Sequence, residues 1–454
     1  MPYDWNGHST YHTFCGACAL FILQRISIEI QTERRPTMKN TFLIILIFCA
    51  GNLLAQESLN DYLRVAAENN PALKAKYDSY LATLQRVDQS KSLPDPTLSF
   101  GYFISPVETR VGAQQFKLSV SQMFPWMGTL KTQESLAAAQ AQVQFEAFLE
   151  VKNQLFLEVK NSWLALYALE EEIKLSRANL GILKSYEPVT KTKYESDLVS
   201  LADLVRVQIS IDDAQTKLKI LEMKRAPLIS SLNTLLNRPI DSEVNIGVLS
   251  QITTERQLLL DSALAQHPSV LEAQSRISVA ETQIELSDLK RKPNIGVGLD
   301  YAFVSKRTDM SVPDNGKDIL MPMVSVSLPI FGKKNRALKK EAILNKESAE
   351  SNLIATQNNI KNSWEQTAFA VQKAQIETTL FEKEIAQTNL LLNVLLSEYS
   401  NDSRNFEDLL ATQLQLLQLQ LAALSAEVNF YQAHFNKEYL TGNNLQDFIS
   451  HENQ

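Results

Sequence analysis

Two stretches of alternating apolar and polar residues decide the fold: residues 292–303 read KPNIGVGLDYAF, and residues 95–104 read DPTLSFGYFI. This period of two predicts β-strands with one apolar and one polar face. A shorter alternation follows each stretch, at residues 116–121 and 324–328. We therefore predict two strand pairs, over residues 97–123 and 294–328. Strands of this kind have the roughly 9–11 residues that a tilted membrane strand needs.

The same landmarks occur twice along the chain. Five motifs recur in the same order at offsets of 197 to 205 residues: Asn70-Pro71-Ala72 as His267-Pro268-Ser269, Asp95-Pro96 as Lys292-Pro293, Phe124-Pro125 as Leu328-Pro329, Asn161-Ser162-Trp163 as Asn362-Ser363-Trp364, and Tyr194 with Asp203 as Tyr399 with Asp408. Repetition at a nearly constant spacing is the signature of a duplicated structural unit. We predict a first repeat over residues 56–251 and a second over residues 252–454.

Helical patterns surround the strand pair of each repeat. The first helix is expected over residues 58–91, and Pro94 and Pro96 end it because proline cannot continue a helix. After the strands, a very long helix and a shorter returning helix form a hairpin, over residues 129–236 and again over 333–440. At about 1.5 Å per residue, each long helix would extend roughly 100 Å.

The remaining segments are predicted to be connections. Loops are expected at residues 105–115 and 305–318, which contain proline and glycine. Residues 237–260 lack strong periodicity and are expected to connect the two repeats, and a tail follows residue 440. Pro188 and Pro227 lie inside helical pattern, where they predict local kinks.

Residues 38–55 have the layout of a secretory signal peptide: a charged start, an apolar core and the small residue Ala55 at the end. The apolar core has roughly half of the ~20 residues that a membrane anchor needs. Residues 1–37 are expected to be an upstream extension and not a domain. Their Cys15 and Cys18 lack the second pair of a zinc site. Since Cys49 is the last of three cysteines, the chain after the signal has none.

Four strands per chain cannot close a membrane barrel, because outer-membrane barrels have roughly eight strands or more. Edges open to lipid would leave backbone groups without hydrogen bonds. Several chains are therefore expected to share one barrel, in a mixed α/β membrane protein with long helices. An ordinary coiled coil or helical bundle is the alternative that helical periodicity alone would favour. It does not account for the two strand pairs.

The repeated order of helix, strand pair, long helix and returning helix resembles that of the TolC-like outer membrane efflux family. The resemblance extends over essentially all of the chain after the signal. It implies a homotrimer with a shared twelve-stranded transmembrane β-barrel in the outer membrane and an α-helical barrel in the periplasm. Each protomer would supply four strands and two helical hairpins. A periplasmic adaptor protein and an inner-membrane RND or ABC pump are the implied partners.

The hairpin tips carry the most specific part of this resemblance. Tyr399, Arg404 and Asp408 have the spacing of the family's second tip, and the resemblance implies that they form a periplasmic gate. Asp408 would repeat once per protomer around the entrance, and such a ring favours cations. Without the resemblance, Arg404 and Asp408 are an ordinary i,i+4 pair on a helix surface, worth about 0.2–0.5 kcal/mol.

The resemblance also assigns adaptor docking to residues at the two turns: Asp197, Leu198, Val199, Asp203 and Asp402. The family commonly has glycine at the turn, whereas this chain has Asp197 and Asp402 there. Because aspartate tolerates a left-handed backbone better than most residues, we expect the turns to form.

The sequence has no enzyme signature: it lacks a phosphate-binding Gly loop, a Gly-x-Ser-x-Gly elbow and a His-Glu-x-x-His motif. His267, His434 and His451 lie far apart, and His267 is expected to start a helix. We expect no catalysis, no cofactor and no resident metal. The net charge of −7 gives no indication of nucleic-acid binding.

Small solutes are the expected cargo, either drugs or metal cations. The segment from Leu93 to Trp126 resembles the heavy-metal branch of the family. Two alternatives stay open. One is the outer-membrane duct of a type I protein secretion system, which has the same fold. The other is a soluble periplasmic coiled-coil adaptor, which would have no lipid-facing strands.

Overall fold

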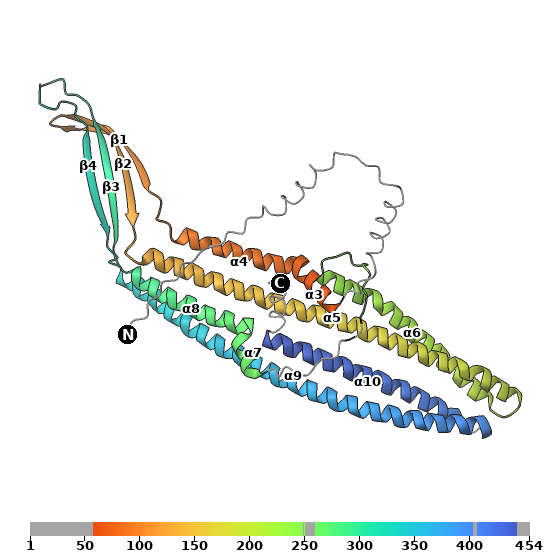
Figure 1. Ribbon diagram of the computed structural model, residues 1–454. Coiled ribbons are helices and arrows are strands. Elements are labelled where there is room, and N and C mark those ends of the chain that lie inside the picture. The colour runs from red at the N-terminus through yellow and green to blue at the C-terminus, as the bar shows by residue number, and fades with distance from the viewer. Residues whose placement is uncertain (1–57, 248, 250–258, 403–405, 443–454) are drawn as a thin grey trace, which may run out of the picture. The chain divides into compact units, whose positions relative to one another are not determined.

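The structure is a computed structural model that describes residues 58–247, 249, 259–402 and 406–442 (Figure 1). The predicted extension at residues 1–37, the signal peptide at 38–55, the end of the tail and Arg404 lie outside the described residues. The described part contains eight helices, α3 to α10, and one sheet of four strands. Its elements follow the same order in both halves: two short helices, two strands, a very long helix and a returning helix.

The first helical stretch of each half is two helices, so the prediction of one continuous helix over residues 58–91 is wrong. Helix α3 (Leu59–Asn69) ends and α4 (Pro71–Ser90) begins at Asn70, whose side chain accepts hydrogen bonds from the N–H groups of Ala72 and Leu73. Pro71 occupies the first turn of α4, where its missing N–H is not needed. The periodicity continues across the break and does not reveal it.

The second half breaks at the equivalent position. Helix α7 (Leu260–Gln266) is followed by α8 (Pro268–Leu289), and His267 is the N-cap of α8. The Nδ1 atom of His267 accepts a hydrogen bond from the Ser269 N–H at 3.2 Å. The predicted role of His267 at a helix start is confirmed.

The sheet is antiparallel and has the order β1-β2-β3-β4. Its strands are β1 (Thr97–Thr109), β2 (Gly112–Phe124), β3 (Asn294–Val304) and β4 (Ile319–Ser327). The loop expected at residues 305–318 separates β3 from β4. The loop expected at 105–115 is wrong, because β1 continues to Thr109 and only residues 110–111 form the turn. Pro106 is accommodated where the pairing of β1 with β2 shifts register, between Tyr102 and Val107.

The two faces of the sheet differ in polarity, as the period of two predicts. One row of paired residues crosses the whole sheet through Leu98, Val120, Leu299 and Pro322. Apolar side chains on this face are exposed, with Ile104 at 91% and Val324 at 75%. The adjacent row crosses the other face through Ser99, Ser119, Asp300 and Met321. On that face Asp300 forms an ion pair with Lys117.

Four long helices follow the strands. They are α5 (Thr129–Glu195), α6 (Leu201–Leu235), α9 (Gly332–Asp402) and α10 (Phe406–Thr441). Their bounds lie within a few residues of the two predicted hairpins. Helix α9 has 71 residues, so at about 1.5 Å per residue it is roughly 100 Å long. Pro188 lies inside α5 and Pro227 inside α6.

The helices form a layer that is four helices wide. Near the strands the neighbours in contact are α4, α5, α8 and α9; nearer the hairpin tips they are α6, α5, α10 and α9. Figure 1 shows α4 and α6 following one another along α5, and α8 and α10 following one another along α9. The two longest helices therefore run through the layer, while the other positions change occupant halfway.

Polar side chains join α5 and α10, the two central helices in the part of the layer nearer the hairpin tips. Lys160 of α5 forms an ion pair with Glu438 of α10 at 2.6 Å. The buried Gln413 of α10 donates a hydrogen bond to Asn179 of α5 at 3.0 Å. Since buried polar groups cost free energy unless they are paired, these contacts fix the alignment of the two helices.

The connector between the repeats is held against the first half by Tyr62 of α3. The phenol oxygen of Tyr62 accepts a hydrogen bond from the Asn245 N–H at 3.1 Å and donates one to the Asn245 carbonyl at 3.2 Å. Tyr62 is fully buried in a cluster that contains Phe156 and Trp163 of α5. The start of the connector is thus attached to the helical layer.

Helix α10 is the one helix of the described part that is long and apolar enough to cross a membrane by length and composition. The leucines of α10 pack inside the helical layer. Leu409, Leu410 and Leu416 are buried in a cluster with residues of α5, α6 and α9. The apolar character of α10 thus serves packing within the layer.

Gly112 at the tight β1–β2 turn should not tolerate a side chain. Its φ is +135°, and a Cβ there would lie 1.7 Å from the Ser305 carbonyl oxygen. Such a backbone costs other residues about 1–3 kcal/mol. Samples are heated to a series of temperatures before electrophoresis, and the folded protein migrates faster than the unfolded one. We expect Gly112→Ala to lower the temperature at which the fast-migrating form is lost. Gly101→Ala, which meets nothing within 4 Å, is the control and should leave that temperature unchanged.

Candidate functional site at the hairpin tips

The turn between α5 and α6 has the left-handed backbone expected of it. Asp197 has φ = 57°, so aspartate occupies the conformation for which glycine is usually selected. The N–H of Leu198 donates to the Lys193 carbonyl at 2.9 Å, and the N–H of Asp197 donates to the Tyr194 carbonyl at 3.0 Å. Both hydrogen bonds close the end of α5. Asp402 is the last residue of α9, and the turn beyond it lies outside the described residues.

Asp203 lies in the first turn of α6, where its carboxylate takes part in capping the helix. Its carboxylate accepts hydrogen bonds from the Ser200 N–H at 3.2 Å and the Ser200 hydroxyl at 2.7 Å, while Ser200 caps the Asp203 N–H. This reciprocal capping box satisfies two otherwise unpaired donors. Val199 packs against the buried cluster of the tip, whereas Leu198 is 59% exposed. Of the residues assigned to docking, Leu198 is therefore the exposed apolar one.

Tyr399 joins the two hairpins. It belongs to α9, but its side chain is buried and its phenol oxygen lies 3.3 Å from the Thr190 Oγ1 of α5. Burial raises the pKa of Tyr399, and the contact with Thr190 opposes this shift. The ring of Phe406 of α10 packs against the Tyr399 ring, with 5.1 Å between the two ring centroids. The phenol is thus a neutral group held between α5, α9 and α10.

Lys193 makes a second contact with the same residue. Its ammonium group donates to the Tyr399 carbonyl oxygen and lies 4.4 Å from the centre of the Tyr399 ring. A cation over an aromatic ring contributes about 0.5–2 kcal/mol, depending on how far it is desolvated. Lys193 stands in the last turn of α5, where a cation also favours the helix dipole.

Arg206 and Glu407 form an ion pair between α6 and α10. The guanidinium of Arg206 lies 3.1 Å from the Glu407 carboxylate and 3.2 Å from the Asp203 carboxylate. Glu407 is 71% exposed, so solvent screening limits the pair to less than about 1 kcal/mol. Sequence reasoning missed this pair, because no repeat landmark or helical spacing relates residue 206 to residue 407.

The structure brings together only part of the predicted gate. Tyr399 is buried at the hairpin contact, while Asp408 is exposed in the first turn of α10, beside Glu407. Arg404 lies outside the described residues. Among the described residues, three polar pairs join the two tips: the Tyr399 phenol with Thr190, Lys193 with the Tyr399 carbonyl, and Arg206 with Glu407. These polar pairs border a buried apolar cluster in which Tyr186, Tyr399 and Phe406 pack across the two hairpins.

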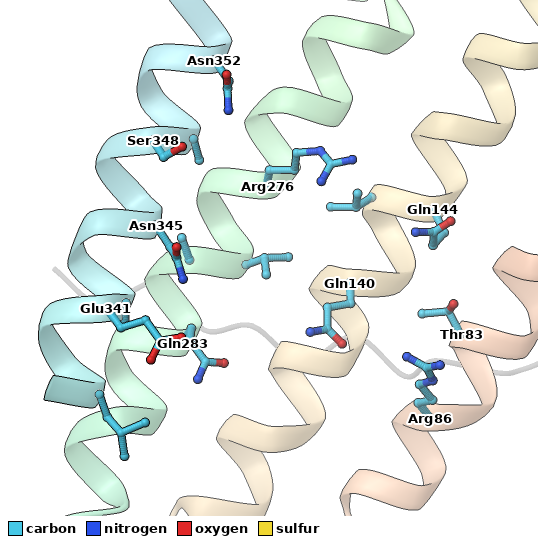
Figure 2. A pocket seen from close by; sticks show the side chains of 16 residues that line it. Thr83, Arg86, Gln140, Gln144, Arg276, Gln283, Glu341, Asn345, Ser348 and Asn352 are labelled. Carbon is cyan, nitrogen blue, oxygen red and sulfur yellow. The ribbon is translucent and has the colours of Figure 1, made fainter. Parts of the chain in front are cut away.

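A second feature lies on the part of the layer nearer the strands. Helices α4, α5, α8 and α9 form a concave surface with a cavity of about 620 Å³, which we call the polar wall (Figure 2). Five carboxamides line it: Gln140, Gln144, Gln283, Asn345 and Asn352. Arg86, Arg276 and Glu341 add charges of both signs. Carboxamides both donate and accept hydrogen bonds, so this surface offers many weak contacts to polar solutes.

No group of three or more His, Cys, Asp or Glu side chains within the described ranges could hold a metal ion. His267 is buried and engaged as a helix cap, and burial lowers its pKa. The tip residues and the polar wall offer hydrogen bonds and charges to a solute or a partner.

The comparisons with known proteins agree with one another. Residues 259–440 match the family described as Outer membrane efflux protein. Nodulation protein T of Rhizobium leguminosarum bv. trifolii is 22% identical over 361 residues, which cover 73% of each chain.

Solved structures agree with the fold. The outer membrane protein VceC of Vibrio cholerae matches with a TM-score of 0.70 at 15% identity, over 85% of this chain and 96% of VceC. The CmeC outer membrane channel of Campylobacter jejuni matches with a TM-score of 0.70 at 14% identity, over 97% of this chain and 94% of CmeC.

Removing the Tyr399 ring should loosen the tips far more than removing its hydroxyl. Truncation of a large buried ring costs about 3–5 kcal/mol, whereas one hydrogen bond contributes about 0.5–1.5 kcal/mol. We expect trypsin to cleave Tyr399→Ala at Lys191 and Lys193 much faster than the wild type, and Tyr399→Phe only slightly faster. Equal cleavage of all three proteins would show that Tyr399 does not hold the hairpins together.

Proposed function

This chain is a TolC-like outer membrane efflux protein, located in the outer membrane. We propose that it forms the channel component of a tripartite efflux system. In this proposal three copies share one barrel, the channel exports small solutes, drugs or metal cations, and the protein catalyses no reaction. A periplasmic adaptor and an inner-membrane RND or ABC pump complete the system.

The sheet carries the proposal. Its apolar face is exposed, and its edge strands β1 and β4 each have a neighbour in this chain on one side only. In lipid every backbone N–H and C=O must be paired, so an open sheet cannot span a membrane. Pairing β1 of one copy with β4 of the next satisfies both edges. Three copies would give twelve strands, within the range of outer-membrane barrels. A soluble adaptor would have no use for this apolar face.

The edges of the helical layer support the same assembly. Exposed apolar side chains follow α9 on one edge, with Phe369, Ile376 and Leu390 each more than 60% exposed. Exposed Ile209 and Met223 follow α6 on the other edge. Two different edges that meet head to tail generate a ring when the rotation closes. The helical layer would then close into a barrel that continues the β-barrel.

The interior of such a tube would have to be wettable. The polar face of the sheet and the polar wall are the surfaces that fit this requirement, because polar side chains such as Ser119, Asp300 and Gln140 lie on them. Many weak hydrogen-bonding sites allow a solute to bind and leave again, which conduction needs.

The hairpin tips are the proposed entrance. Tyr399, Arg404 and Asp408 form the gate, and the contacts of Tyr399 with Thr190 and Lys193 support the part that Tyr399 plays. Breaking them would let one hairpin move away from the other. The adaptor would dock at Asp197, Leu198, Val199, Asp203 and Asp402, with exposed Leu198 as the apolar contact.

A trimer in the outer membrane is the first expected outcome. Protein expressed from Met38 should fractionate with the outer membrane and keep the mass of three copies after detergent extraction. Ile376→Glu on the α9 edge should lower the trimer fraction, because it places a charge in the apolar interface. Ile240→Glu changes an equally exposed isoleucine of the connector and should not. A soluble periplasmic monomer would contradict the channel proposal.

The gate makes a separate prediction. Tyr399→Phe combined with Arg404→Ala should raise the conductance of the trimer in a planar bilayer, because the phenol contact with Thr190 and the charge of Arg404 are lost together. Tyr102→Phe, which changes an exposed tyrosine of β1, is the control and should conduct as the wild type does. Unchanged conductance in the double variant would count against the gate while leaving the channel intact.

A further inference from the structure

A cavity of about 710 Å³ lies between α5, α10 and α9, on the part of the layer nearer the tips. Three carboxylates and three aromatic rings line it: Glu171, Glu382 and Glu427, with Tyr167, Phe430 and Tyr431. We call it the acidic groove. None of its fourteen described lining residues is lysine, arginine or histidine. The groove shares no residue with the polar wall or with the gate.

Two of the carboxylates, Glu427 and Glu171, are half-buried and lie close enough for their charges to interact. Burial raises the pKa of Glu427, and the charge of Glu171 raises it further. Burial raises the pKa of Tyr167 to about 12, helped by the charges of Glu427 and Glu171. Lys174 forms an ion pair with Glu171 at 3.1 Å, but its side chain is 75% exposed and does not line the groove.

The lining determines which kind of cation fits. No set of carboxylates in the described part of the chain has the grouping that a metal ion needs. The groove instead combines the carboxylates with aromatic rings and the apolar side chains of Leu175, Ile385 and Leu424. Cations with an apolar body are attracted by aromatic faces as well as by carboxylates. Its volume lies within the range of small-molecule sites, about 300–1,000 Å³.

We propose that the acidic groove binds organic cations that carry an apolar or aromatic body. The positive centre lies near Glu427 and Glu171, and the apolar body contacts Tyr167, Tyr431 and Leu424. Gln375, Gln420, Thr378 and Thr379 supply hydrogen bonds at the rim. This binding does not require the gate or transport, so it goes beyond the proposed channel function.

Tetraphenylphosphonium is a suitable probe, because tetraphenylborate has the same shape and the opposite charge. Binding to the detergent-extracted protein is measured by equilibrium dialysis, with protein-free micelles subtracted. We expect saturable binding of the phosphonium and none of the borate. Glu427→Gln, which keeps the shape of the side chain, should weaken phosphonium binding by about tenfold or more.

Glu384→Gln is the matched control, since it removes a carboxylate from α9 that does not line the groove, and it should bind as the wild type does. Tyr431→Leu should also weaken binding, because it removes an aromatic face. Gel mobility of the unheated protein checks the fold of each variant. Equal affinity for the two probes, or equal affinity of wild type, Glu427→Gln and Tyr431→Leu, would overturn the proposal. Neither result would affect the channel proposal, which is tested by outer-membrane fractionation and by the mass of the extracted trimer.

Discussion

The hydrogen-bonding requirement of the peptide backbone is the constraint on which the arrangement of this protein depends. A four-stranded antiparallel sheet satisfies its inner strands and leaves β1 and β4 each with one side to pair. In water such an edge is tolerable, but next to lipid it is not. In the proposed channel, the apolar face of the sheet contacts lipid, and the edge strands of neighbouring copies pair with each other. The helical layer, with apolar side chains along both edges, meets the same demand by packing instead of by hydrogen bonds.

Sequence periodicity predicted the strands and the long helices well, because both depend on which side chains face a core or a membrane. It failed where a single residue decides the backbone. The tight turn before Gly112 depends on the φ of +135° at that residue. From the sequence, the proline and glycine of residues 105–115 indicate a longer loop. The break at Asn70 depends on a side-chain cap that interrupts the helix without interrupting its apolar pattern. Pro106 predicts a loop, but β1 continues through it because the pairing of β1 with β2 shifts register there.

The candidate site was predictable to a lesser degree. The resemblance singled out Tyr399, and its burial between the hairpins gives that residue a physical role. The partners of Tyr399 were not predicted, since Thr190 and Lys193 lie about two hundred positions away and belong to another helix. The ion pair of Arg206 with Glu407 needs the fold to be known before it can be seen. The acidic groove was equally hidden, because its carboxylates come from three helices.

Two of the four positions in the helical layer are each occupied by two successive helices, and this arrangement has a mechanical consequence. Helices α5 and α9 are continuous rods, whereas α4 is succeeded by α6 and α8 by α10, with a cap or a short helix at each joint. A rod resists bending along its whole length, but a joint concentrates bending at one level. The two joints lie at the middle of the layer, around Asn70 and His267, and we expect bending to concentrate there. A displacement of the hairpin tips can be absorbed there before it strains the register of the strands.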